Sequence, residues 1–315
     1  MRLEKWISKI LMMIVLSYYC LSGHSQVVNE YLRNGWKYYE SKDFKKAIQE
    51  FTKGIDIDAT NYHLYMSRGK CKLIEHDYLG ARYDLNKAIS IDPNNPYGYV
   101  ERARCNYFEK KFDAALKDIS KAIDLDNTNS EFYYLRSAIK KENEDTIGSI
   151  NDLIKITELG KEFVYDSYVL IAGEKTKLND YKEAIYYYTK AIEYSPEVSG
   201  EDMSIYITRG QLKFRLKDYY GALSDLNIGI KYLPNEFDAY IIRSQINYML
   251  KKFDEAILDC NTAIKLDAKN PEGYFERGLI KIVLRDKEGG CVDLSKAGEL
   301  GSKKAYDYIV EFCNN

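Results

Sequence analysis

Apolar and small residues return along this chain with a period of about 34 residues, and within each period they lie three or four positions apart. Eight tyrosines mark the period at spacings of 34, 34, 34, 35, 38, 34 and 34 residues: Tyr31, Tyr65, Tyr99, Tyr133, Tyr168, Tyr206, Tyr240 and Tyr274. When each repeat is numbered from three residues before its tyrosine, positions 4, 7, 8 and 11 share one face of a first helix. Positions 20, 23, 24 and 27 share one face of a second helix. A unit this small cannot bury its apolar face alone, so the pattern predicts an all-α chain of about eight stacked helix-turn-helix units.

Small residues occupy position 8 of every repeat, and they also dominate positions 20 and 27. The position 8 series is Gly35, Gly69, Ala103, Ser137, Ala172, Gly210, Ser244 and Gly278. Such residues would let the two helices approach closely while the tyrosine ring fills the space beside them. With a bulky residue at position 24, this pattern resembles the tetratricopeptide repeat (TPR) family over residues 28–301. The resemblance implies a right-handed α-solenoid whose concave face takes extended peptides or partner helices.

A second regularity pairs opposite charges. Position 7 is arginine and position 23 is aspartate in the same six repeats, and repeats one and five lack both. The pairs are Arg68 with Asp84, Arg102 with Asp118, Arg136 with Asp152, Arg209 with Asp225, Arg243 with Asp259, and Arg277 with Asp293. Because the two positions lie on facing sides of the helices, we predict an ion pair within each repeat, with the arginine stem packed over the interface. The alternative is a row of arginines that binds a ligand.

The array divides into two predicted blocks. Residues 148–160 resemble residues 289–301, an offset of 141 that suggests related copies over 26–160 (repeats one to four) and 161–301 (repeats five to eight). The two unusual tyrosine spacings flank repeat five, so we expect a hinge within residues 142–205. Residues 302–315 should contain a capping helix, because Ala305, Tyr308, Ile309 and Phe312 share one face and the end of a repeat array must be covered.

The N-terminal residues 1–25 do not fit the repeat. A basic head, a mostly apolar stretch over residues 10–19 and small residues before the cut predict a secretory signal peptide cleaved between Ser25 and Gln26. Ten apolar residues are too few for an anchor, since a spanning helix needs about 20. Lipid attachment at Cys20 is an alternative that the bulky residues before it disfavour. We therefore expect an exported chain, periplasmic or at the cell surface, with no transmembrane segment after cleavage.

Charge and motifs exclude several classes of function. Removal of residues 1–25 takes away three basic residues and one acidic residue, which leaves 43 basic and 47 acidic residues and a net charge of −4. No arginine-rich face interleaved with aromatics occurs, so we expect no nucleic-acid partner. The sequence contains no HExxH, CxxC, GxSxG or phosphate-binding glycine loop. We therefore expect no enzyme activity, no cofactor and no metal site.

The cysteines do not form a disulfide framework in the sequence. Five remain after cleavage, an odd and scattered set: Cys71, Cys105, Cys260, Cys291 and Cys313. They are expected to be small buried hydrophobic residues, although export to an oxidising compartment leaves one disulfide possible.

The family resemblance places a binding groove at positions 2, 5, 9 and 12 of the first helices. In the early repeats this groove would present Trp36, Tyr39, Met66, Lys70, Tyr97, Arg104 and Tyr134. In the later repeats it would present Gln211, Phe214, Asp238, Gln245 and Phe275. Aromatic side chains beside cations are typical partner anchors, but Tyr39, Phe214 and Phe275 could equally be helix contacts.

The family's carboxylate clamp is absent, because positions 6 and 9 never carry asparagine. The resulting hypothesis is an exported, non-catalytic scaffold for a protein or peptide partner. The alternatives are a module that binds a glycan or short peptide and an accessory subunit of an enzyme on another chain.

Overall fold

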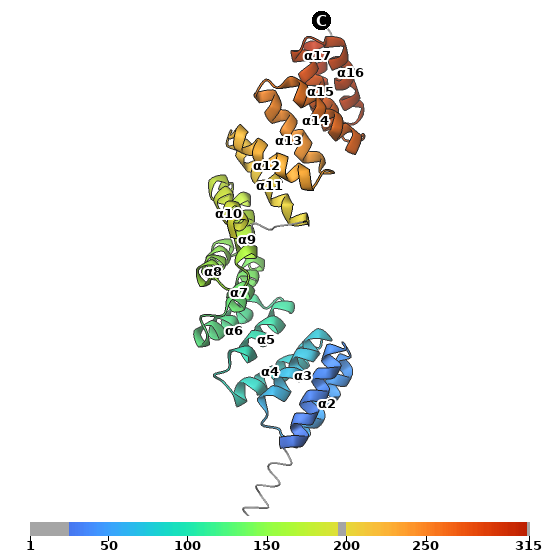
Figure 1. Cartoon of the computed structure of the whole chain (residues 1–315). Coiled ribbons are helices and arrows are strands. Elements are labelled where there is room, and N and C mark those ends of the chain that lie inside the picture. Colours follow the sequence, from blue (N-terminus) through green and yellow to red (C-terminus); the bar gives the residue numbers. More distant parts are fainter. Residues whose placement is uncertain (1–24, 195–199, 314–315) are drawn as a thin grey trace, which may run out of the picture. The chain divides into compact units, whose positions relative to one another are not determined.

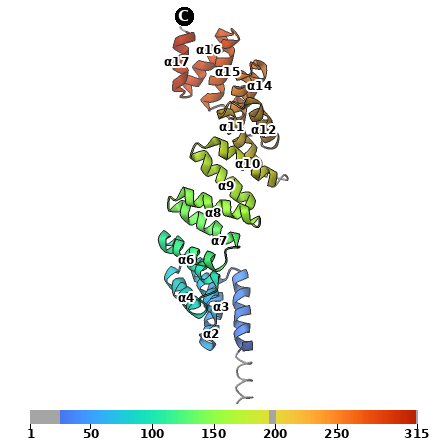
Figure 2. The same cartoon turned by 90° about the vertical axis from the view of Figure 1, so that its left-hand side faces the viewer.

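The computed structural model describes residues 25–194 and 200–313, and every regular element in these residues is helical, so the predicted fold class is confirmed (Figures 1 and 2). The predicted signal peptide lies outside the described residues except for Ser25. No helix within 25–194 or 200–313 is both long and apolar enough to cross a membrane. The chain divides into two compact units, Met1–Phe163 and Val164–Asn315, each treated separately below.

The first unit contains repeats one to four as consecutive helix pairs. A helix over residues 25–40 precedes α2 (Phe44–Ile57), α3 (Tyr62–Ile74), α4 (Tyr78–Ile91), α5 (Pro96–Phe108), α6 (Phe112–Leu125), α7 (Ser130–Glu142) and α8 (Thr146–Leu159). The first helix of each repeat packs against the second, and the second packs against the first helix of the next repeat.

The second unit contains repeats five to eight and a final single helix. Its elements are α9 (Val164–Lys177), α10 (Tyr181–Tyr194), the short 3₁₀ helix η1 (Gly200–Met203), α11 (Ser204–Arg215), α12 (Tyr219–Tyr232), α13 (Phe237–Met249), α14 (Phe253–Leu266), α15 (Pro271–Val283), α16 (Lys287–Glu299) and α17 (Lys303–Phe312). Helix α17 packs on α16. Ala305 is fully buried there, and Tyr308 and Ile309 contact the cluster around Phe275 and Leu294. The last helix therefore covers the apolar side of repeat eight.

Local capping residues explain where the helices begin. In six repeats an aspartate at position 16 accepts a hydrogen bond from the backbone N–H three residues later, as Asp77 does from Gly80 at the start of α4. Asparagines cap four of the first helices, and Asn95 does so directly before Pro96, a residue that needs no N–H partner at this position.

The small residues at position 8 allow the close helix contact that the sequence predicts. A Cβ atom on Gly69 would lie 3.0 Å from Cγ of Leu85 and 3.3 Å from the carbonyl oxygen of Ala81. Leu85 and Ala81 are positions 24 and 20 of the same repeat, and both are fully buried. The two helices of the repeat therefore meet at positions 8, 20 and 24, where a larger side chain at position 8 would force them apart.

Three of the five cysteines are small buried residues as expected, and the other two form the single disulfide that the sequence left possible. Cys71, Cys105 and Cys260 are buried free thiols. Cys291 and Cys313 instead form a disulfide, with Cα atoms 5.8 Å apart. Because α17 folds back on α16, it brings together two cysteines that are 22 residues apart in sequence. The disulfide ties the end of the capping helix to repeat eight.

Candidate binding pocket of the first unit

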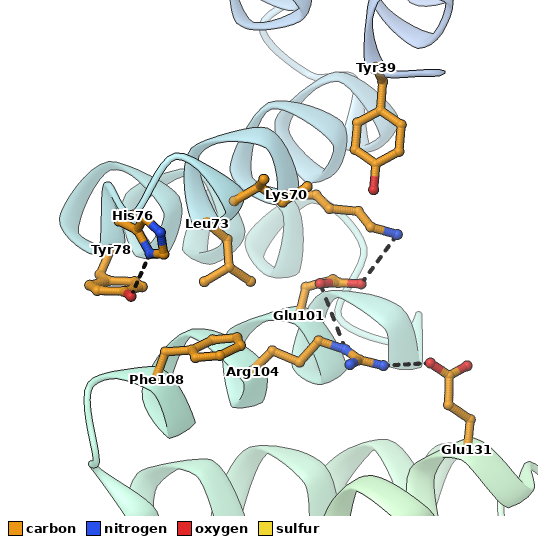
Figure 3. Close-up of a pocket in the computed structure, with 10 residues that line it drawn as sticks. Tyr39, Lys70, Leu73, His76, Tyr78, Glu101, Arg104, Phe108 and Glu131 are labelled. Atoms are coloured by element: carbon orange, nitrogen blue, oxygen red, sulfur yellow. Dashed lines mark hydrogen bonds and ion pairs between the residues drawn. The ribbon is translucent and has the colours of Figure 1, made fainter. Parts of the chain in front are cut away.

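The first unit contains an open pocket of ≈ 400 Å³ where the ends of α3 and α5 lie beside the 25–40 helix, α4 and α7 (Figure 3). Its lining residues are Tyr39, Lys70, Leu73, Ile74, His76, Tyr78, Glu101, Arg104, Phe108 and Glu131. Figure 3 shows the charged side chains toward one end, beside Tyr39, and the rings of His76, Tyr78 and Phe108 toward the other. The pocket therefore offers two chemically different ends to a ligand.

The apolar end is formed by Leu73 and Ile74 at the end of α3, Tyr78 at the start of α4, and Phe108 at the end of α5. The rings of Tyr78 and Phe108 are nearly parallel, at 14°, with centroids 6.5 Å apart. His76 lies edge-on to Tyr78, and its Nδ1 is 3.0 Å from the tyrosine hydroxyl (Figure 3). Phe108 is 56% exposed, an unusual fraction for a phenylalanine. This end is an apolar surface that the fold itself leaves uncovered.

The charged end is a row of alternating charges that crosses three helices. Lys70 Nζ of α3 lies 3.7 Å from Glu101 Oε1 of α5, and Arg104 Nε lies 4.0 Å from Glu101 Oε2. Arg104 also donates to Glu131 of α7 through an Nη2–Oε1 hydrogen bond of 2.5 Å. Two cations thus face two carboxylates, and their charges balance within the pocket.

Glu101 is the most buried of these charged groups, at 8% exposure. Burial raises the pKa of its carboxyl, and the nearby cations Lys70 and Arg104 oppose that rise. The Lys70 ammonium also lies 5.8 Å from the ring centroid of Tyr39. The pocket brings together three of the residues expected in the groove, Tyr39, Lys70 and Arg104.

The other expected groove residues of the first unit contact neighbouring side chains. Trp36 is half-buried and lies edge-on to Tyr39 and Phe51, with centroids 5.0 and 6.1 Å away. Met66 packs against two apolar clusters. Trp36 and Met66 therefore belong to the packed interior more than to an open surface.

Two further aromatics contact neighbouring rings within the unit. Tyr97 of α5 is exposed and lies edge-on to Phe132 of α7 at 5.7 Å. Tyr134 stacks on Phe163 with centroids 4.8 Å apart. A binding role for Tyr97 and Tyr134 stays a prediction.

In the second unit the expected groove is largely occupied by packing. Phe275 is 6% exposed and lies edge-on to Tyr308 of the capping helix at 5.4 Å, so the helix-contact interpretation is correct for this residue. Phe214 is half-buried beside Tyr219. Gln245 donates a 2.7 Å hydrogen bond to Glu276, and burial raises the pKa of that carboxyl. Gln211 is half-buried and Asp238 is exposed.

The arginines of position 7 are held by bidentate ion pairs within their own repeats. Arg68 donates from Nε and Nη2 to the two oxygens of Asp84, at 2.8 and 2.7 Å. The Nη2–Oδ1 distance is 2.5–2.7 Å in all six pairs. Each guanidinium also lies 5.5–5.7 Å from the ring centroid of the position 4 tyrosine. These tyrosines and arginines thus bind each other within the array.

Two polar positions that the sequence did not single out complete the network. The residue at position 11 donates to the same aspartate of its repeat. In four repeats it is a lysine whose ammonium lies 2.8 Å from the carboxylate: Lys72, Lys140, Lys213 and Lys281. In two repeats it is an asparagine that donates from its side-chain amide, Asn106 and Asn247. Nη1 of each arginine donates to position 25 of the preceding repeat at 2.6–3.4 Å. The acceptors are Thr52, Asn86, Ser120, Thr189, Asn227 and Asn261. The arginine ladder, defined by positions 4, 7, 11, 23 and 25, therefore links neighbouring repeats, and its arginines are engaged.

The described part of the chain holds no group of three or more His, Cys, Asp or Glu residues arranged to bind a metal ion. The described residues thus form an all-helical repeat protein whose first unit contains an open pocket with an apolar end.

Comparisons with known proteins agree with this architecture. The family model described as tetratricopeptide repeat matches residues 165–198, the stretch numbered here as repeat five. A comparison with curated proteins found no match.

Three solved structures illustrate the fold. The C-terminal part of a TPR repeat-containing protein from Cytophaga hutchinsonii is 21% identical, with 77% of this chain and 98% of that chain covered and a TM-score of 0.61. A chain in the structure of Naa15/Naa10 bound to HypK-THB is 14% identical with a TM-score of 0.57; the alignment covers 91% of this chain and 45% of that one. A MamA double mutant is 15% identical with a TM-score of 0.50; the alignment covers 56% of this chain and 96% of that chain.

Proposed function

We propose that this protein is an exported, non-catalytic scaffold that binds a protein partner through the pocket of its first unit. The observation that carries the proposal is the uncovered apolar end of the pocket, where Phe108 and Ile74 stand exposed beside Tyr78. The corresponding residues of other repeats are polar in Glu40, Glu142, Lys177 and Arg215 and aliphatic or methionine in Ile74, Met249 and Val283, so Phe108 is the aromatic residue of this position. An exposed aromatic beside a cavity is typical of a site that a partner covers.

The chemistry of the pocket favours binding over catalysis. Lys70 and Arg104 are paired with Glu101 and Glu131, so the polar groups balance one another. One structure with this fold is a complex, Naa15/Naa10 bound to HypK-THB. Assembly with another protein is therefore a use to which this fold is put, and we extend it to this chain as a proposal.

Two observations support export. Residues 1–25 have the composition of a secretory signal peptide. The disulfide between Cys291 and Cys313 is a bond that persists in oxidising compartments and is rare in the cytosol.

Export is tested by expressing the full chain in its source cells and determining the mature N-terminus by mass spectrometry. We expect Gln26 as the first residue. Recovery of the protein in the cytosol with its first 25 residues intact would contradict the proposal.

Partner binding is tested by capture from an envelope extract of the source cells, with the mature chain as bait. We expect a saturable partner that Phe108→Ala loses. The matched control is Met249→Ala, because Met249 occupies position 13 of repeat seven as Phe108 does in repeat three, and is 55% exposed. If no partner saturates, or if both variants capture it equally, the pocket is not the binding site.

A further inference from the structure

The charged end of the pocket is already neutralised, which limits the ligands that it can take. Lys70 is paired with Glu101, and Arg104 is paired with both Glu101 and Glu131. Glu101 is nine-tenths buried and therefore always lies between the two cations (Figure 3). A ligand carboxylate would compete with Glu101 and Glu131 for the two cations, and a ligand cation would compete with Lys70 and Arg104 for the two carboxylates, so a charge of either sign gains little here.

The same cations can still interact with an uncharged ring. The side chains of Lys70 and Arg104 are 35% and 34% exposed, so each presents part of its surface to the pocket. A cation attracts the face of an aromatic ring without a neutralising charge on the ligand, as the contact of Lys70 with Tyr39 at 5.8 Å illustrates. At the other end, the ring of Phe108 and the side chain of Leu73 offer apolar contact.

Size and placement favour a side chain of a polypeptide as the occupant. The volume of ≈ 400 Å³ is near the lower limit for ligand pockets, and the pocket is open along the first helices. We propose that the pocket takes an uncharged aromatic side chain of the partner, with its ring between Phe108 and the cations Lys70 and Arg104. That the ring belongs to a protein partner rests on the proposed function. The preference of the pocket for an uncharged ring can be measured without the partner.

The test uses three probes that share one indole ring and differ in charge: N-acetyltryptophanamide (neutral), N-acetyltryptophan (anionic) and tryptophanamide (cationic). Binding is followed through the methyl resonances of Leu73 and Ile74 in the mature protein. We expect the neutral probe to bind about fivefold more tightly than either charged probe, the scale of a partly exposed charge interaction. Phe108→Ala should abolish the shifts, whereas Met249→Ala should leave them unchanged.

Glu101→Gln provides the decisive variant, because it removes the buried negative charge and keeps the size of the side chain. Lys70 then lacks its carboxylate, so the preference should invert and the anionic probe should bind best. Unchanged methyl resonances outside the pocket show that the variant is folded. An anionic probe that binds best in the wild-type protein, or an unchanged order in Glu101→Gln, overturns the inference.

The two proposals can fail separately. If the neutral probe binds in the expected order but no protein partner is captured, the selectivity stands and the scaffold function falls. If Phe108-dependent capture of a partner succeeds while the probes follow another order, the inference falls and the function stands.

Discussion

Position 15 of all eight repeats adopts the left-handed backbone conformation, and none of these residues is glycine. They are Lys42, His76, Lys110, Glu144, Asn179, Lys217, Lys251 and Arg285, with φ between 58° and 69°. The turn between the two helices of a repeat requires this conformation, which costs an L-residue about 1–2 kcal/mol. Five of the eight are lysine or arginine directly after a helix C-terminus, where a positive charge is favourable. Charge therefore offsets part of the backbone strain.

Glycine at position 15 should stabilise the array. We expect Lys110→Gly to raise the free energy of unfolding of its unit by about 0.5–1 kcal/mol, because relief of strain exceeds the added entropy of the unfolded chain. The matched control is Lys117→Gly, in the exposed middle of α6, which should lose about 1 kcal/mol. Urea unfolding followed by circular dichroism measures both changes, and a loss in Lys110→Gly would contradict the expectation.

The half-buried carboxyl of Glu276 should make stability depend on pH. Burial raises its folded-state pKa above the usual value of 4.5, so the folded state holds this proton more tightly than the unfolded state does. Stability from this group is therefore present below about pH 4.5 and is lost as the pH rises through the folded-state pKa. Glu276→Gln should raise the unfolding midpoint at pH 7 and leave it unchanged at pH 3.5, since the amide can still bond Gln245. An equal shift at both pH values would assign the effect to packing.

The arginine ladder is the feature of the helix pair that can be tested most directly. Asp259 is 3% exposed and is held by Arg243 and Asn247. Arg243→Met keeps an apolar stem over Tyr240 but leaves a buried carboxylate with only an amide partner, which should cost about 3–5 kcal/mol. Asp259→Asn in the same chain removes the uncompensated charge.

The double variant of Arg243→Met and Asp259→Asn should therefore be more stable than Arg243→Met alone. Urea unfolding of the two single variants and the double variant gives the coupling energy between the two side chains. Losses that simply add would mean that the pair contributes no specific interaction.

The helix pairs could be predicted from the sequence because their packing depends on single positions that repeat. Small residues at position 8 and bulky ones at position 24 are visible in the sequence, and Gly69 and Leu85 meet in the structure accordingly. The ion pairs follow from the joint occurrence of arginine and aspartate. Position 25 escaped notice because threonine, asparagine and serine alternate there, so only a shared ability to accept a hydrogen bond connects Thr52 with Asn86.

The pocket was only partly predictable. Tyr39, Lys70 and Arg104 lie at groove positions of the family, whereas Glu101 and Phe108 lie at positions 6 and 13. Whether a side chain at these positions remains exposed to solvent depends on the neighbouring repeat. That repeat provides Glu131 as an ion-pair partner for Arg104 but no side chain that buries Phe108. The exposure of a side chain therefore depends on how neighbouring helices pack, and it cannot be predicted from the sequence of one repeat. For the same reason the sequence left a disulfide possible but did not identify Cys291 and Cys313 as its partners, since their pairing depends on how α17 folds back on α16.

At the scale of the whole molecule, the ladder is not continued in repeat five. Position 7 is Ile171, position 23 is Tyr187, and position 25 of the preceding repeat is Ile154, so none of the three can form the arginine–aspartate link. Repeat five is also where the second compact unit begins, at Val164. Repeat stability is approximately a sum of unit and neighbour terms, so a repeat without its ladder should open at lower free energy than its neighbours.

Restoring the ladder in repeat five tests this explanation. Tyr168 and Lys175 already occupy positions 4 and 11 of this repeat. Ile171→Arg with Tyr187→Asp would add the arginine of position 7 and the aspartate of position 23, which completes the ladder residues that lie within the second unit. In the wild-type chain we expect amides of α9 and α10 to exchange faster than those of α13 and α14. The double variant should protect α9 and α10 at least as well as wild type, whereas Ile171→Arg alone should reduce protection because it places an unpaired charge at a fully buried site. Native-state hydrogen exchange resolves these helices individually. Equal protection of α9–α10 and α13–α14 in the wild-type chain would show that the missing ladder does not set local stability.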